Sequence, residues 1–82
     1  MYEADMQALA HLRERRRELD EKLAASIDRR TDAKERGDEK TVTRERANIA
    51  LLTTYITRCN QDIFSMERKL GVDPEGLGAP SE

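Results

Sequence analysis

The sequence contains no tryptophan and a single cysteine, and aromatic residues make up only 4% of its 82 residues. One cysteine excludes an intramolecular disulfide, and with it a disulfide-stapled scaffold. A chain this short, with so few bulky side chains, has little material for a core that encloses a pocket. Only two prolines are present, so long helices would meet few interruptions.

Long apolar runs are also missing. A run such as IALL at 49–52 is far too short to cross a bilayer, so we expect no membrane span. The opening residues MYEADM are acidic and lack an apolar stretch, so we expect no signal peptide and a cytoplasmic protein. The net charge of −2 provides no basic surplus, which disfavours a protein built mainly to hold nucleic acid.

Charged residues are abundant, at 39% against 37% hydrophobic. This balance is typical of long helices that carry a narrow apolar stripe. A chain this charged can also be disordered throughout. The near-neutral net charge and the regular spacing of the apolar residues favour helices over disorder.

The C-terminal half carries the clearer apolar stripe. Its members recur at alternating spacings of three and four, a heptad pattern that predicts a coiled-coil helix over about 39–70. Gly71 suits a left-handed C-terminal cap, and Pro74 prevents continuation of the helix. The stripe consists of Val42, Glu45, Ile49, Leu52, Ile56, Cys59, Ile63, Met66 and Leu70.

A weaker stripe at the same spacing predicts a first helix over about 3–36. Arg16 occupies one of its positions and either fixes the register of the helices or lays its stem along the seam with its charge in water. Met6 and Ile27 lie one residue off the stripe. The stripe consists of Tyr2, Asp5, Leu9, Leu12, Arg16, Leu19, Leu23, Ser26, Arg30 and Ala33.

The two stripes match as an antiparallel pair in one register, which places Leu23 opposite Leu52 and Arg30 opposite Glu45. The midpoint of this register lies between Gly37 and Asp38, where glycine can end a helix and aspartate can cap the next. The predicted fold is therefore all-α, an antiparallel two-helix coiled-coil hairpin with its turn at 37–38. The alternative is one continuous helix, kinked at Gly37, in a longer or domain-swapped assembly.

The turn also contains Arg36-Gly37-Asp38, the tripeptide that integrins bind. Each of the three residues has a capping or pairing role in the expected turn. Without an expected secretion signal, a structural role is favoured over adhesion.

A single hairpin buries only one seam, which is a marginal core for a chain of this length. Several apolar residues lie beside the stripes, as in helices of a bundle. We therefore expect the hairpin to form a homodimeric four-helix bundle or to accept a helix of a partner protein. The predicted contact residues are Ile27, Leu51, Leu52, Tyr55, Ile56 and Phe64.

Arginines cluster in RERRR at 13–17 and again near the turn. Guanidinium groups match phosphate geometry, so nucleic-acid binding is the second functional hypothesis. The expected architecture is similar to small dimeric RNA-binding hairpins of the Rop kind, a likeness of fold alone. Interspersed carboxylates and the lack of stacking aromatics favour a solvated or protein-contacting face instead. The residues concerned are Arg13, Arg16, Arg17, Arg29 and Arg30.

Residues for catalysis or metal binding do not occur at useful spacings. His11 is the only histidine and lies off the stripe, while Cys59 is expected to be a small buried apolar residue. Neither a catalytic triad nor a metal-ligand pattern can be built from them, and no glycine-rich phosphate loop is present. We expect a non-enzyme with no metal, cofactor or small-molecule substrate.

The predicted function is thus a non-catalytic protein–protein interaction module, such as an adaptor, scaffold, assembly factor or small inhibitor. A third hypothesis is a small structural subunit of a phage or bacterial particle. The remaining residues, 71–82, read GVDPEGLGAPSE and predict a non-helical tail anchored by Val72 and Leu77.

Overall fold

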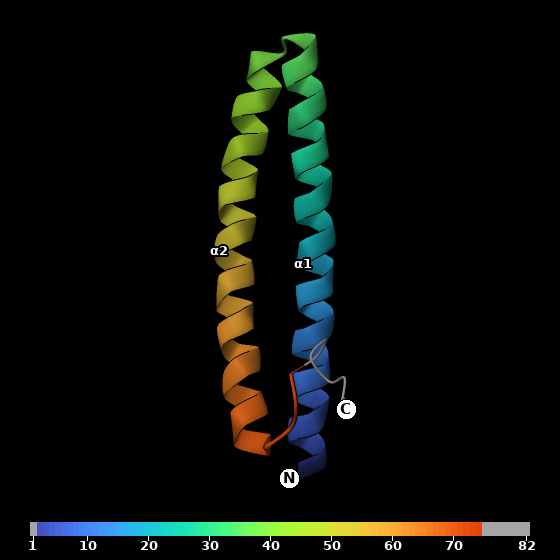
Figure 1. Ribbon diagram of the computed structural model, residues 1–82, viewed down its shortest axis with the longest axis vertical. Helices are drawn as coiled ribbons and strands as arrows, with labels where there is room; N and C mark the ends of the chain where they lie inside the picture. Colours follow the sequence, from blue (N-terminus) through green and yellow to red (C-terminus); the bar gives the residue numbers. More distant parts are fainter. Residues whose placement is uncertain (1, 75–82) are drawn as a thin grey trace, which may run out of the picture.

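The computed structural model describes residues 2–74, which form two long helices joined by a tight turn (Figure 1). Helix α1 spans Tyr2–Arg36 and helix α2 spans Glu39–Leu70. The two run antiparallel and side by side, with the turn at one end of the molecule and the start of α1 and the end of α2 at the other. The predicted all-α helical hairpin is confirmed, and the alternative of one continuous helix is wrong.

Local sequence explains why both helices are so long. No proline occurs between Tyr2 and Leu70, so no backbone donor is lost inside either helix. Helix α1 begins with Glu3 and Asp5 and ends with Lys34 and Arg36, the charge order that a helix dipole favours.

The turn has the geometry of a glycine-terminated helix. Gly37 has φ 74°, and the backbone N–H of Asp38 donates to the carbonyl of Ala33 at 2.8 Å. The Asp38 carboxylate then caps α2 by accepting from the backbone N–H of Thr41 at 3.2 Å and from its hydroxyl at 2.8 Å. The hydroxyl bond of Thr41 is the main reason that the pKa of Asp38 is lowered. Arg36 pairs with Asp32, so each residue of the Arg-Gly-Asp tripeptide has a structural role.

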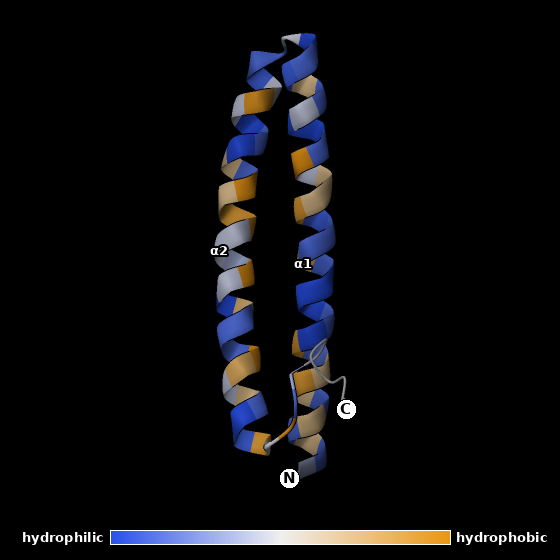
Figure 2. Ribbon diagram, in the orientation of Figure 1, coloured by the Kyte–Doolittle hydropathy of each residue, from blue (hydrophilic) through white to orange (hydrophobic). Residues whose placement is uncertain are grey.

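The core is a seam between the two helices. Every residue of the two predicted stripes is buried or half-buried except Tyr2, which is 60% exposed. Apolar segments alternate with hydrophilic ones along both helices, and the turn end is mostly hydrophilic (Figure 2). The central cluster consists of Leu9, Leu19, Leu52, Cys59 and Ile63.

Beyond α2 the chain folds back towards α1 (Figure 1). Gly71, with φ 68°, ends the helix, and its backbone N–H donates to the carbonyl of Glu67 at 2.8 Å. Val72 packs against the core, as predicted for an anchor, and the carbonyl of Asp73 accepts from Arg13 at 3.0 Å. The other predicted anchor, Leu77, lies outside the described residues.

Candidate interaction site

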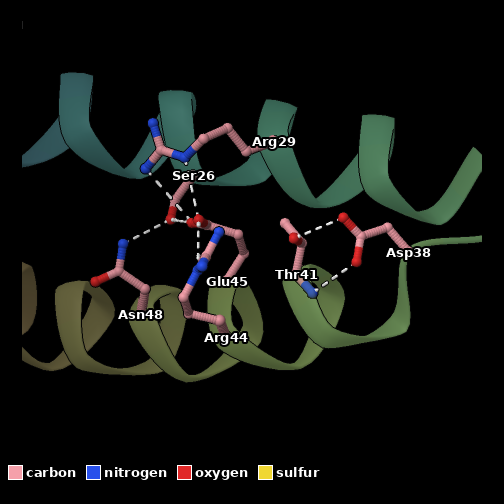
Figure 3. A network of polar contacts seen from close by, with 7 residues as sticks. All are labelled: Ser26, Arg29, Asp38, Thr41, Arg44, Glu45 and Asn48. Carbon is pink, nitrogen blue, oxygen red and sulfur yellow. Dashed lines mark hydrogen bonds and ion pairs between the residues drawn. The ribbon is translucent and has the colours of Figure 1, made fainter. Parts of the chain in front are cut away.

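A carboxylate is enclosed between the helices near the turn. Glu45 of α2 is only 5% exposed and accepts hydrogen bonds from the hydroxyl of Ser26 and, at 3.1 Å, from Nε of Arg29, both on α1 (Figure 3). Asn48 donates to the same Ser26 hydroxyl at 2.8 Å. These bonds, led by that of Ser26, lower the pKa of Glu45. The carboxylate is thus held ionised inside the seam, and the polar layer favours one register of the helices because a shift would leave the charge without partners.

The predicted partner of Glu45 was wrong by one residue. The register from the sequence placed Arg30 opposite Glu45, whereas Arg29 makes the ion pair. Arg30 instead borders a hollow on the other side of the hairpin, together with Val42 and Arg46. The fully buried Ser26 leaves room above its small side chain for the Glu45 carboxylate, and Arg29 reaches that carboxylate from the flank.

A second enclosed carboxylate lies towards the open end of the hairpin, where α1 begins and α2 ends. Glu67 is 5% exposed and accepts from Nη2 of Arg13 at 3.0 Å. This ion pair was not predicted from the sequence. Its signal is that Arg13 and Glu67 each follow a stripe residue, Leu12 and Met66, at the flanking positions where coiled coils carry charge pairs.

The five arginines of the nucleic-acid hypothesis do not form one face. Arg13 and Arg29 form ion pairs with the buried carboxylates of Glu67 and Glu45. Arg17 lies 3.7 Å from the Glu14 carboxylate on the surface, and Arg16 is half-buried. Arg30, also half-buried, borders a hollow near the turn that Lys34 and Arg46 share.

Two of the six predicted contact residues belong to the seam rather than to the surface. Leu52 is 7% exposed and Ile56 is half-buried against the central cluster. Both therefore stabilise the hairpin itself. The remaining four keep large apolar side chains in solvent, with exposed fractions of 37% for Ile27, 50% for Leu51, 43% for Tyr55 and 57% for Phe64.

These four exposed residues lie on two different flanks of the hairpin. Leu51 and Tyr55 are one turn apart on α2 and border neighbouring hollows beside the seam. Phe64 follows Arg46 by five full turns, which places it on the flank of the hollow that Arg46 shares with Arg30. Ile27 precedes Arg30 by one turn and lies on that second flank. The guanidinium of Arg68 lies over the Phe64 ring, 5.7 Å from the ring centroid.

The thiol of Cys59 is unsuited to nucleophilic chemistry. It is 6% exposed and donates to the carbonyl of Leu12 at 3.3 Å. Burial raises its pKa, which keeps the sulfur protonated. His11, the only histidine, is exposed.

Residues 2–74 contain no group of three or more histidine, cysteine, aspartate or glutamate side chains that could hold a metal ion. Neither α1 nor α2 combines the length and apolar character that crossing a membrane requires. Among the exposed apolar residues of the described chain, Leu51 and Tyr55 lie one turn apart on α2.

Comparison of the chain with known protein families, with curated proteins and with solved structures finds no match.

Proposed function

We propose that this protein is a non-catalytic protein–protein interaction module that works by self-association of its hairpin into a four-helix bundle. The observation that carries the proposal is the exposure of Leu51 and Tyr55, at 50% and 43%, one turn apart on the same flank of α2. Exposed apolar groups next to a seam are typical of helices that pack on a further layer. Roles as an adaptor, scaffold, assembly factor or small inhibitor all fit such a module.

The thinness of the core supports the same proposal. Only one seam of side chains separates the helices; one of its layers, at Glu45, is charged, and a second buried carboxylate, Glu67, lies beside the seam. Buried ionic layers contribute little net stability compared with apolar ones. A second hairpin would add the apolar burial that small helical scaffolds otherwise lack.

Nucleic-acid binding is the second candidate, favoured by one observation. Arg30, Lys34 and Arg46 border a common hollow near the turn, and such a cluster of cations can attract a phosphate, although the carboxylate of Glu35 borders the same hollow. The ion pairs of Arg13 and Arg29 with buried glutamates weaken this candidate, because two of its five arginines are already neutralised within the hairpin.

Native mass spectrometry of the protein, purified without nuclease, separates the two candidates. Self-association predicts a homodimer whose melting temperature rises with protein concentration. Leu51→Asp should reduce the dimer fraction, whereas Thr57→Asp, an exposed change elsewhere on α2, should not. A protein that stays monomeric at every concentration would refute self-association. Bound RNA or DNA that dissociates steeply with added salt would favour the second candidate.

A further inference from the structure

One row of α2 has the same spacing when read from either end. Starting at Arg44, its members follow at intervals of four, three, four, three and four residues. All are exposed except the half-buried Asn48, and they border the two hollows on the flank of Leu51 and Tyr55. We call this set the Leu51 row; it consists of Arg44, Asn48, Leu51, Tyr55, Arg58 and Asp62.

A palindromic row can pair with an identical copy of itself about a two-fold axis. If a second α2 runs antiparallel, with the axis midway between Leu51 and Tyr55, Leu51 lies opposite the partner's Tyr55. The next layer outward places Asn48 opposite the partner's Arg58. The outermost layer places Arg44 opposite the partner's Asp62. Each contact occurs twice, once on each side of the axis.

The residue types in these layers are complementary. The two central layers join an aliphatic side chain to an aromatic one, the usual composition of an interface core. In the next layer, Asn48 already donates its Nδ2 to Ser26, which leaves its carbonyl oxygen as an acceptor for a guanidinium. In the outer layer, opposite charges meet, and Arg44 has the reach for this because its side chain is 72% exposed.

We propose that a second copy of this chain packs along the Leu51 row, antiparallel and centred between Leu51 and Tyr55, with Arg44 paired to Asp62 of the partner subunit. The inference rests on the proposed self-association and specifies its face, direction and register. In this arrangement the contact between the two copies is made by α2 of each hairpin.

Other arrangements of two copies bring together groups that repel or do not complement each other. A parallel, in-register pair would bring each Arg44, Arg58 and Asp62 against its own copy, so that three layers would carry like charges, which disfavours association. An antiparallel pair shifted by one heptad would place the partner's Asp62 against Leu51. On the opposite flank, Phe64 lies near the open end and Ile27 on α1, so they offer no such continuous row.

A charge-swap series tests the register by sedimentation equilibrium. Arg44→Asp and Asp62→Arg should each weaken the homodimer about tenfold, because each puts like charges together twice in the dimer. The double variant Arg44→Asp/Asp62→Arg restores opposite charges in both layers and should return the dissociation constant to within about threefold of the original. Arg46→Asp, an exposed change on the other flank, is the matched control and should leave the dimer intact.

The helicity and melting temperature of each variant, measured at the lowest protein concentration, show whether the variant still folds. Asp62→Arg is the key single variant, since Arg44 also lies 3.8 Å from the Glu45 carboxylate. If the single changes leave the dissociation constant of the dimer unaltered, or if the double change does not restore it, this register is wrong although self-association still holds. A dimer lost on Phe64→Asp but kept on Leu51→Asp would move the interface to the opposite flank. A protein that is monomeric throughout would overturn both proposals.

Discussion

Arg13 and Glu67 form an ion pair across the open end of the hairpin, with 3.0 Å between Nη2 of the arginine and Oε2 of the glutamate. The same nitrogen lies 3.0 Å from the carbonyl oxygen of Asp73. One guanidinium group thus joins α1, α2 and the segment that follows α2. It holds together the end of the molecule where no turn connects the helices.

Arg13→Leu is expected to destabilise the protein by about 1–3 kcal/mol, because the Glu67 carboxylate would stay enclosed without its cationic partner. Chemical denaturation followed by circular dichroism measures the loss. The control Arg15→Leu changes an exposed arginine and should have little effect. The double variant Arg13→Leu/Glu67→Leu should recover most of the loss, since it removes both charges; a double variant as unstable as the single one would contradict this explanation.

Two adjacent leucines provide a matched test of the seam. Leu52 is 7% exposed and Leu51 is 50% exposed. Leu52→Ala is expected to cost about 2–5 kcal/mol, as cavities in cores do. Leu51→Ala should change the stability of the isolated hairpin by no more than about 0.5 kcal/mol. Thermal unfolding at low protein concentration compares them, and equal losses would show that the helix is rotated relative to this seam.

The left-handed turn residue gives a prediction about backbone alone. Gly37 has φ 74°, and a Cβ added there would meet no atom within 4 Å. Gly37→Ala should therefore cost about 1 kcal/mol through backbone strain, without any clash. Gly37→Asn should cost less, because asparagine tolerates this conformation better than alanine does. If alanine and asparagine proved equally neutral in urea unfolding, the turn would not have this geometry.

The polar layer at Glu45 makes stability depend on pH. Its pKa is lower in the folded protein than the ordinary value near 4.5, so the unfolded chain binds more protons in acid. Its contribution is complete above the unfolded pKa and is lost as pH falls through the folded pKa. The melting temperature should therefore fall on acidification below about 4.5.

Glu45→Gln removes this titration and should flatten the acid limb of the melting-temperature profile. The exposed Glu18→Gln makes the same change of charge on α1 and serves as the control. An acid limb that is equally steep in wild type and Glu45→Gln would show that the buried layer does not control the pH response. Asp38, whose pKa is lowered by its bonds to Thr41, contributes with the same sign and accounts for part of the slope that remains.

The sequence alone allowed the hairpin to be predicted because its signals are local and agree with one another. The heptad spacing of α2 sets its buried face, the absence of proline sets the helix lengths, and Gly37 with Asp38 sets the reversal. Leu52 and Ile56 were correctly assigned to this stripe, but they were also predicted to contact a partner, whereas they pack inside the hairpin. Leu51 and Tyr55 could be recognised as off-stripe residues from spacing alone.

Side-chain partners across the seam required the tertiary structure. Spacing along a helix gives the face of a residue to within one position, but a long, flexible arginine reaches partners on either side of its own layer. For this reason Arg29, not Arg30, binds Glu45. Arg13 likewise pairs with the Glu67 carboxylate and donates to the carbonyl of Asp73. Periodic apolar spacing and turn chemistry determined the hairpin, because these signals act within a few residues of each other in the sequence. The packing of the helices decided which charges are enclosed and which apolar side chains remain exposed, because the burial of a side chain depends on atoms that are distant in the sequence.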